Sequence, residues 1–577
     1  MARSERGYTT STAFLEALAE AGVRYVFANL GSDHPGLVEA CARARDEGRA
    51  EELPELVICP HESVALSAAQ GYAQASGQPQ AVVVHVDCGT QNLGGTLHNA
   101  AKARVPVLIF AGASPVTQEG ELPGGRNEFI HWIQDVPDQR GIVRGYTKYD
   151  NEIRTGRNVK QLVHRAIQIA CSEPAGPVYL VGAREVMEEQ LTPAPGRPEL
   201  FTPATPGALA PEVADRIADA LAGARNPVVV TSNLGREPDA VVELVRLCER
   251  LAIRVIESVP MYVNFPADHP LHAGYQWNTP APNPALTEAD VILVLGCEVP
   301  WIPSLNRPAE DARVFVVDAD PLKEHTPLWH VPAELYARAN PGLAARQLAD
   351  AVAADSVRTD EVAARYTRSV AEHDGRAADR ARKARPRPDV ITPEYLAACV
   401  HDAIDDETIV LSEAITNFGV VSEFVPRSVP GTLFGSGGSS LGWHAGAAIG
   451  VKLAVPDRLV VSLVGDGTYL FGVPASASWM ARRYGTPNLT VIIDNQGWRA
   501  PKLSTLAVHP DGVAAANDDF GVGLAPSADL PGVAAAAGGA WARTVVDPAE
   551  LPALLTEAVK VVRDGRSAVL AVRVPAV

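Results

Sequence analysis

With 577 residues, 47% of them hydrophobic, the chain is too long for one core, and we expect about two to four domains. Its formal net charge of −18 disfavours nucleic acid and anionic membranes as main partners, and no apolar run reaches the roughly 18–20 residues of a membrane span. No basic-then-apolar leader opens the chain and its seven cysteines are scattered without a Cys-x-x-Cys pair, so we expect a cytoplasmic protein with reduced thiols.

Three blocks of the chain each alternate short apolar runs with segments of helical length. A Pro-rich stretch at residues 191–211 is typical of a linker, and the charged stretch at 372–388 is expected to be an exposed connection. Strands that alternate with helices indicate parallel sheets covered on both faces. We therefore predict three doubly wound α/β domains, at residues 1–190, 205–365 and 390–577.

The strands of these domains are predicted where β-branched and other apolar residues run together between turn residues. The predicted strands are residues 81–85, 105–110 and 177–181 in the first block, 227–231, 253–256, 291–296 and 314–318 in the second, and 459–464 and 489–493 in the third.

Two loops of the third block directly follow predicted strands. Residues 465–468 read Gly-Asp-Gly-Thr, residues 494–497 read Asp-Asn-Gln-Gly, and a segment of helical length separates them. In a parallel sheet both loops emerge at the carboxyl edge, where open α/β sheets bind ligands. Asp466 offers a carboxylate, and Asn495 an amide oxygen, beside main-chain groups that glycine leaves accessible. Such oxygen ligands, completed by phosphate oxygens, are typical of Mg²⁺, so this pair of loops predicts a Mg²⁺–diphosphate site.

These loops resemble the motif of thiamin diphosphate (ThDP) enzymes, which begins Gly-Asp-Gly and ends at a pair of asparagines. The resemblance implies that Asp466, Asn495 and the carbonyl of Gly497 ligate Mg²⁺. Asp494 stands where the family has its first Asn, a position that is not a ligand in the family. The cofactor contacts that the resemblance implies are Gly465, Asp466, Gly467, Thr468, Asn495 and Gly497 here, and Glu413, Gly437, Ser439 and Leu441 upstream.

The first block contains a candidate for the family's activating carboxylate. Glu62 follows His61 and opens a helix-like segment of small residues that includes Gly-Tyr-Ala at 71–73, as in the family. From local sequence alone, a carboxylate in a first helical turn is also explained by the helix dipole. The resemblance implies that Glu62 contacts the aminopyrimidine ring of the cofactor and promotes loss of the thiazolium C2 proton.

A glycine-rich loop at residues 435–443 precedes the Mg²⁺ loops. Read alone, it is a loop that permits close backbone approach. In the family a bulky apolar residue at this place bends the cofactor into a V shape, and Leu441 occupies that position. Glu413, at a strand end where the family's diphosphate pocket begins, is expected to act structurally rather than catalytically.

The resemblance to the ThDP decarboxylase and acetohydroxyacid synthase family covers essentially the whole chain, and two details resemble benzoylformate decarboxylases. Residues 26–32, Val-Phe-Ala-Asn-Leu-Gly-Ser, resemble a turn whose serine holds the substrate carboxylate, which makes Ser32 a candidate. His85, followed by Gly-Thr-Gln-Asn at 89–92, matches an active-site histidine suited to proton transfer. The alternatives are a turn residue for Ser32 and a hydrogen-bonded strand-end histidine for His85.

The sequence also departs from the family. The loop at residues 296–303 lacks the second active-site histidine of benzoylformate decarboxylases; His131 could substitute, or could be a surface or core residue. The flavin segment of acetohydroxyacid synthases is missing too, so FAD is unexpected and biosynthetic acetolactate formation is doubtful. Trp498 is either a pocket residue or a packing residue. Cys88, without a basic partner, is expected to be a small core residue.

Taken together, these features predict an enzyme that uses ThDP and Mg²⁺ to cleave or form the C–C bond next to a carbonyl. The main expectation is decarboxylation of a 2-oxo acid, with aldehyde release or carboligation. The alternatives are a flavin-free acetolactate synthase-like transferase, a 2-hydroxyacyl-CoA or oxalyl-CoA lyase, and a non-catalytic ThDP-binding protein. Because the family builds each site from two subunits, the resemblance implies a homodimer or homotetramer.

Overall fold

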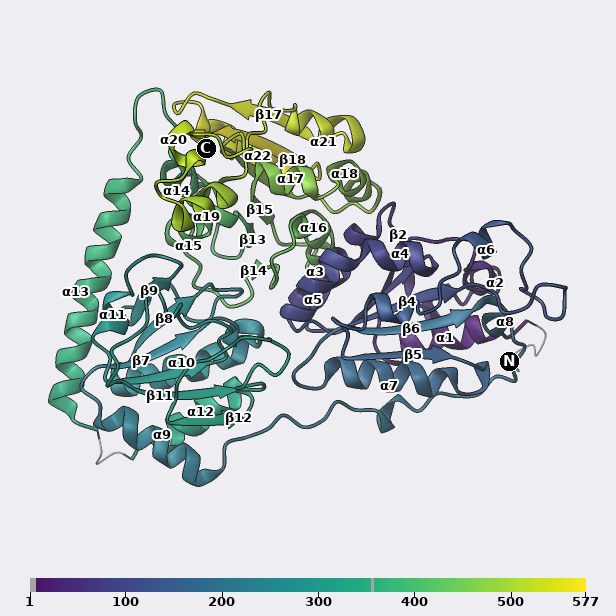
Figure 1. Ribbon diagram of the computed structural model, residues 1–577, viewed down its shortest axis with the longest axis horizontal. Coiled ribbons are helices and arrows are strands. Elements are labelled where there is room, and N and C mark those ends of the chain that lie inside the picture. Colours follow the sequence, from purple (N-terminus) through teal and green to yellow (C-terminus); the bar gives the residue numbers. More distant parts are fainter. Residues whose placement is uncertain (1–6, 354–356, 577) are drawn as a thin grey trace.

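The computed structural model describes residues 7–353 and 357–576, which form three domains, each built on a six-stranded parallel sheet (Figure 1). The strand orders are β2-β1-β3-β4-β6-β5, β12-β11-β10-β7-β8-β9 and β14-β13-β15-β16-β18-β17. Every pairing between neighbouring strands in these orders is parallel. The prediction of three doubly wound α/β domains is therefore confirmed.

The first domain carries strands β1 (Tyr25–Ala28), β2 (Glu55–Ile58), β3 (Gln80–Val84), β4 (Val107–Ala113), β5 (Tyr149–Ile153) and β6 (Val178–Ala183). Its helices are α1 (Thr10–Glu20), α2 (Pro35–Asp46), α3 (Glu62–Ser76), α4 (Val86–Asn92), α5 (Gly94–Lys102), α6 (Ile130–Ile133), α7 (Val159–Cys171) and α8 (Arg184–Met187). From this domain, residues 191–210 lead to the second, with one short 3₁₀ turn at Pro198–Leu200.

The second domain carries β7 (Pro227–Thr231), β8 (Arg254–Ser258), β9 (His272–Gln276), β10 (Val291–Leu295), β11 (Arg313–Asp318) and β12 (Leu335–Arg338). Its helices are α9 (Pro211–Gly223), α10 (Pro238–Leu251), α11 (Pro284–Thr287) and α12 (Pro341–Ala351). Central strands such as β10, Val-Ile-Leu-Val-Leu, are buried along their whole length, as expected for a sheet covered by helices on both faces.

The third domain carries β13 (Ile409–Glu413), β14 (Leu433–Gly435), β15 (Val460–Gly465), β16 (Leu489–Asp494), β17 (Trp541–Val545) and β18 (Ala568–Arg573). Its helices are α14 (Pro393–Ala403), α15 (Phe418–Phe424), α16 (Trp443–Ala454), α17 (Asp466–Phe471), α18 (Pro474–Arg483), α19 (Arg499–Val508), α20 (Val513–Asn517), α21 (Leu530–Gly538) and α22 (Leu551–Arg563). Side chains of Thr392 and Asp529 cap the starts of α14 and α21, as their types favour.

The charged segment predicted as an exposed connection is largely helical. Residues 372–383 form the second half of α13 (Thr359–Lys383), which runs along the outside of the second domain toward the third (Figure 1). Only Arg365 and Ser369 of this helix are buried. The connection is therefore exposed, as expected from its charge, but it is helical. No helix in the described part of the chain is long and apolar enough to cross a membrane.

The first and third domains are joined by the close packing of α3 against α16. A Cβ atom built on Gly450 would lie 1.9 Å from the carbonyl oxygen of Ala68, and one on Gly446 would lie 2.5 Å from that of Val64. The two helix backbones therefore approach more closely than side chains would allow. This packing fixes the start of α3 relative to the loop that precedes α16.

Candidate active site

Asp466 and the Asn495–Gly497 loop lie together at the carboxyl edge of the third sheet, as predicted from their strands. The β15–β16 register pairs Gly465 with Ile493, so the chain leaves both strands at the same level. Asp466 accepts hydrogen bonds from the main-chain N–H of Gly467 at 2.8 Å and of Gly497 at 3.0 Å. The Asn495 side-chain oxygen lies 3.3 Å from the same Gly497 nitrogen. The Asp466 carboxylate and the Asn495 amide oxygen thus lie close to the same main-chain nitrogen, that of Gly497.

The electrostatics of this loop favour a cation. Burial, together with the nearby Asp494 carboxylate, raises the pKa of Asp466 to about 6, although the two main-chain donors act in the opposite direction. Asp494 itself pairs with Arg573 at 3.1 Å. A buried carboxylate that has no cation of its own fits a Mg²⁺ ligand. Within residues 7–353 and 357–576 no three His, Cys, Asp or Glu side chains are grouped to hold a metal, so phosphate oxygens would have to complete the coordination.

Trp498 covers the Asp466 and Asn495 loops rather than entering the core. Its indole lies over Gly467, where an added Cβ would come within 3.3 Å of the ring nitrogen, and 39% of the residue remains exposed. The main chain of the same loop pairs with residues 522–524 through hydrogen bonds from Trp498 to Val522 and from Leu524 to Gln496. The indole ring over Gly467 and the main-chain pairing with residues 522–524 together hold this loop in place.

Glu413 caps helix α16. Its two carboxylate oxygens accept hydrogen bonds from the main-chain N–H groups of Trp443 at 3.2 Å and His444 at 3.0 Å, and His444 Nδ1 lies 2.8 Å away. An acidic group at a helix start is stabilised by the helix dipole. Glu413 thus fixes the end of the glycine-rich loop.

The glycine-rich loop rests on helix α5 of the first domain. Ser440 exchanges two hydrogen bonds with the side chain of Asn99, at 2.8 and 3.0 Å. Gly437 has φ +82°, and a Cβ there would collide with Ala103. Ser439 is exposed and Leu441 half-buried, so both side chains are accessible beside this contact.

Glu62 is the first residue of α3, and it is buried with 8% of its surface exposed. Asn92, at the end of α4, donates a hydrogen bond to Glu62 Oε2 at 3.0 Å. A Cβ on Gly89 would lie 3.3 Å from Oε1, so the carboxylate faces α4. Asn92 is therefore a partner of the proposed activating carboxylate that sequence reasoning had quoted only as part of a motif.

His85 precedes α4 and is held by Asp33, which sequence reasoning passed over. His85 Nδ1 lies 2.6 Å from Asp33 Oδ1, and the main-chain N–H of Val86 donates to Oδ2 at 3.1 Å. The hydrogen bond that His85 donates to Asp33 raises the pKa of His85 above its usual value, against the effect of partial burial. Burial acts to raise the pKa of Asp33, but the His34 and His85 imidazoles and the Val86 N–H outweigh it and lower this pKa.

The turn around Ser32 packs directly against this pair. A Cβ on Gly31 would lie 2.0 Å from His85 Nδ1, so only glycine allows the imidazole to lie here. The Ser32 hydroxyl is buried and makes no hydrogen bond. Buried polar groups are normally paired, so this hydroxyl is available to a ligand. The Gln134 side chain interacts with the His85 imidazole and helps to raise its pKa.

The surroundings of His131 and Cys88 show which role each of these two sequence candidates has. His131 is fully buried, with Nε2 2.9 Å from Arg184 Nη1, and burial and that guanidinium lower its pKa. It packs as a core residue. The expectation that Cys88 is a core residue is wrong: it is exposed on α4. Partial desolvation and Asp87 raise the pKa of its thiol, so it is not an activated nucleophile.

The candidate residues form two groups within the chain. Ser32, Glu62 and His85 belong to the first domain, whereas Asp466 and Asn495 belong to the third. Throughout the described residues, no hydrogen bond or ion pair joins one group to the other. Helix α4, which follows His85, and helix α17, which begins at Asp466, lie apart in Figure 1.

Comparison with known proteins identifies the family that shares this architecture. Three family profiles match: the N-terminal TPP binding domain of thiamine pyrophosphate enzymes at residues 8–142, the central domain at 214–343 and the C-terminal TPP binding domain at 414–572.

Among curated proteins, the chain is 26% identical over 549 residues to benzoylformate decarboxylase of Pseudomonas aeruginosa, which covers 91% of each chain. It is 25% identical over 461 residues to a probable acetolactate synthase large subunit of Methanocaldococcus jannaschii, covering 76% of this chain and 73% of that one.

Among solved structures, the ThDP-dependent 4-hydroxybenzoylformate decarboxylase of Rhodococcus jostii RHA1 superimposes with a TM-score of 0.79 at 21% identity. The match covers 99% of this chain and 100% of that one, and it shows a shared fold. The three matched profiles follow one another in the order of the three sheets, and together they span most of the described residues. The chain belongs to the family of thiamine pyrophosphate enzymes.

Proposed function

We propose that this protein is a ThDP- and Mg²⁺-dependent enzyme that decarboxylates a 2-oxo acid and releases or transfers the resulting aldehyde unit. The observation that carries the proposal is the Asp33–His85 pair at the start of α4, the helix that the Glu62 carboxylate faces. It combines an imidazole biased toward its protonated form with a buried carboxylate, and a protein that only bound the cofactor would need neither. The Mg²⁺ loop around Asp466 supplies the means to hold the diphosphate.

Each residue has a role in this proposal. When bound, ThDP would supply an electron sink for cleavage of the bond next to the substrate carbonyl. Glu62 holds the aminopyrimidine ring, and Asp466, Asn495 and the carbonyl of Gly497 ligate Mg²⁺. His85 gives a proton to the substrate carbon from which CO₂ has left.

The remaining residues bind the substrate or form the walls of the cofactor site. The free Ser32 hydroxyl binds the substrate carboxylate. Leu441 would contact the bound cofactor, and the main chain around Gly437 and Ser439 would border its site. Glu413 acts indirectly, because its oxygens are engaged by the start of α16. Gly465, Gly467 and Thr468 surround the diphosphate.

We further propose that two subunits build each site, in a homodimer or a homotetramer, from domains at residues 1–190, 205–365 and 390–577. The absence of any hydrogen bond or ion pair between the Glu62 and Asp466 groups within one chain supports this arrangement. A carboxylate from one subunit would then face the Mg²⁺ loop of its partner.

Carboligation of two oxo acids is the second candidate. The likeness to a probable acetolactate synthase supports it, because such a reaction shares the first steps and differs in what accepts the acyl unit.

An acyl-CoA lyase, or a flavin site, would need a nucleotide site at the second domain, whose carboxyl edge is the usual position. There the Arg104 guanidinium of the first domain binds Asp318 at 2.8 Å, and Lys323 binds the same carboxylate at 3.0 Å. Arg104 and Lys323 also line a cavity of about 310 Å³, together with Lys102, Arg144 and Lys148, so the second domain does not argue against an anionic ligand.

The test is CO₂ release by the purified protein with ThDP and Mg²⁺ across pyruvate, branched and aromatic 2-oxo acids, with and without an added aldehyde. Products are identified by mass spectrometry. An aldehyde product supports decarboxylation, and an acyloin supports carboligation. Failure to release CO₂ from any 2-oxo acid, with ThDP bound, contradicts the proposal and directs attention to acyl-CoA substrates.

A further inference from the structure

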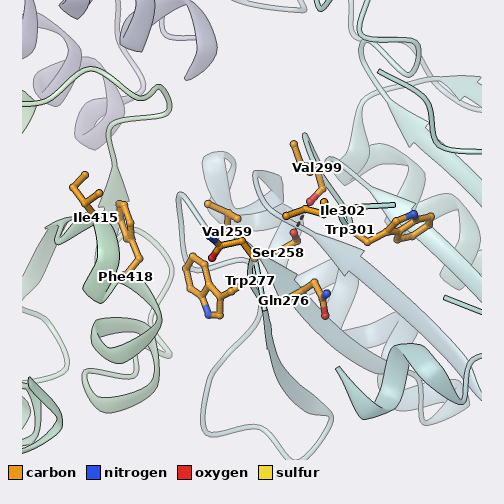
Figure 2. A pocket seen from close by; sticks show the side chains of 10 residues that line it. Ser258, Val259, Gln276, Trp277, Val299, Trp301, Ile302, Ile415 and Phe418 are labelled. Atoms are coloured by element: carbon orange, nitrogen blue, oxygen red, sulfur yellow. Dashed lines mark hydrogen bonds between the residues drawn. The ribbon is translucent and has the colours of Figure 1, made fainter. Parts of the chain in front are cut away.

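We propose that the cavity between the second and third domains receives the side chain of the 2-oxo acid, and that this side chain ends in an uncharged hydrogen-bond acceptor such as a carboxamide oxygen. This inference rests on the proposed function. The cavity has a volume of about 230 Å³. Figure 2 shows Ile415 and Phe418 of the third domain on one side, facing Trp277 and Val259 of the second.

The cavity lies at the same edge of the third sheet as the Asp466 loop. The β13–β15 register pairs Glu413 with Val464, so Ile415 and Asp466 each stand two residues beyond the same level of the sheet. Ile415 opens the 3₁₀ turn Ile415–Asn417, which lies against α19, the helix that follows the Asn495–Gly497 loop. A substrate beside the proposed cofactor site could therefore extend its side chain into this cavity.

Two hydrogen-bond donors are buried in the lining without a partner. They are Gln276 Nε2 and Trp277 Nε1, and no group in the described part of the chain accepts a hydrogen bond from either. Gln276 has only 3% of its surface exposed. Buried polar groups are normally paired, because an unpaired one loses its hydration without compensation. The two free donors therefore indicate that a ligand in this cavity supplies the acceptor.

The chemistry of both residues requires an acceptor rather than a donor from the ligand. The main-chain N–H of Asn283 donates to Gln276 Oε1 at 2.8 Å, so the free end of this amide is its NH₂ group. The indole nitrogen of Trp277 can only donate. The indole ring is held at the domain boundary by Phe418, on which it stacks with centroids 6.2 Å apart and planes at 20°.

The acceptor is expected to carry no charge. None of the residues that line the cavity is charged, and the Ser258 hydroxyl already donates to the Val299 carbonyl. A buried carboxylate needs a positive partner to offset its lost hydration, whereas a carbonyl oxygen needs only hydrogen bonds. The rest of the lining, with Val299 and Ile302, is apolar and suits the carbon atoms of a short side chain.

The backbone supports a ligand role for this cavity. Val259 has φ +48° and Ile415 has φ +49°, a left-handed conformation that β-branched residues rarely adopt. Such conformations are concentrated at functional sites, where the surrounding structure maintains them. The two residues border the cavity from opposite domains.

The experiment compares kcat/KM for 2-oxosuccinamate and 4-methyl-2-oxopentanoate, whose side chains share one shape and end in a carboxamide or an isopropyl group. Both are measured with the wild type, Gln276→Met and Gln161→Met. The first substitution removes the free amide donor, and the second makes the same change on the exposed surface of α7. We expect the wild type and Gln161→Met to prefer the amide by more than tenfold, and Gln276→Met to lose that preference.

The ratio of the two rates separates recognition from a fold defect, because a defect in Gln276→Met would lower both rates equally. Equal use of the two acids by the wild type, or an equal loss with both in Gln276→Met, would overturn the inference. A preference for the charged acid 2-oxoglutarate over both would overturn it too. Trp277→Phe, which keeps the stacked ring and removes the indole N–H, replaces Gln276→Met if circular dichroism shows that the latter does not fold.

A binding measurement separates this inference from the proposed function. Calorimetry follows 2-hydroxysuccinamate and 2-hydroxy-4-methylpentanoate, which have no oxo group to react, on the ThDP- and Mg²⁺-loaded wild type and Gln276→Met. Tighter binding of the amide, lost in the variant, supports the cavity assignment even if no 2-oxo acid is decarboxylated. Equal binding of the two, or no binding of the amide, rejects the assignment even if 4-methyl-2-oxopentanoate is decarboxylated, and would mean that solvent satisfies the two donors.

Discussion

His85 Nδ1 lies 2.6 Å from Asp33 Oδ1, and this contact links the ends of two neighbouring strands, β1 and β3. The second oxygen of Asp33 accepts from the Val86 N–H, so the carboxylate fixes both the imidazole and the main chain behind it. The pair fixes which ring nitrogen is protonated and leaves Nε2 as the atom that can face a substrate. Asp33 is in this sense a positioning residue for His85.

Replacing Asp33 by Asn should shift the pH profile of activity. The hydrogen bond to the Asp33 carboxylate raises the pKa of His85, so activity that needs the protonated imidazole falls as pH rises through that raised value. In Asp33→Asn the alkaline limb of kcat/KM should move to lower pH. The same pairing stabilises the fold below the unfolded pKa of about 6.5, and that stability is lost as pH rises through the folded pKa.

The measurement combines the pH–rate profile with NMR titration of the His85 ring. Asp87→Asn is the control, because Asp87 is the weakest of the contributors that raise the His85 pKa. If Asp33→Asn lowers the overall activity but does not shift its pH profile, Asp33 has a purely structural role.

Glu62→Gln should abolish most activity and leave cofactor binding largely intact. The amide keeps the size of the side chain but does not act as an acid or a base, and such groups contribute about 10²–10⁴-fold. ThDP affinity measured by calorimetry should change little, whereas exchange of the cofactor's C2 proton, followed by NMR, should slow by a similar factor. Full activity in this variant would show that another group activates the cofactor.

Asp466→Asn should weaken Mg²⁺-dependent ThDP binding at least tenfold, because the buried carboxylate is the only acidic metal ligand in the proposed set. Asp494→Asn is the matched control. Asp494 is buried beside Asp466 but pairs with Arg573, so its loss should lower thermal stability and reduce cofactor affinity less than Asp466→Asn does. Calorimetric titrations of ThDP at several Mg²⁺ concentrations distinguish the two. Equal losses of affinity would mean that Asp466 only supports the loop.

The cofactor loops could be predicted from the sequence because each depends on one strand and the few residues after it. Asp466 and Asn495 directly follow two adjacent strands, and a single strand–helix–strand unit makes those strands adjacent. Asp33 could not be assigned in this way. Its contact with His85 requires β1 to lie beside β3, and strand order is a property of the whole sheet. The contact between the Trp277 and Phe418 rings depends on how the second and third domains meet, which no local pattern records.

Gly450→Ala should destabilise the protein, because the new methyl would meet the Ala68 carbonyl at 1.9 Å and force α3 from α16. Overpacking of this kind costs about 1–3 kcal/mol. Gly375→Ala is the control: it lies exposed in α13 with no atom within 4 Å of its added Cβ, and it should stabilise the helix by about 0.5–1 kcal/mol. Urea unfolding midpoints measure both changes. An unchanged midpoint for Gly450→Ala would mean that the two helices separate without cost.

Mixing two inactive variants tests whether two subunits build each site. If Glu62 of one subunit faces Asp466 of its partner, a dimer of one Glu62→Gln and one Asp466→Asn subunit contains one site with both changes and one intact site. Random exchange should then restore about a quarter of the wild-type activity, because half of the dimers are mixed and each has one intact site of two. Subunits are mixed under mild dissociating conditions and reassociated, and each variant alone receives the same treatment. If each site lay within one chain, every site in the mixture would carry one of the changes, and no activity would return.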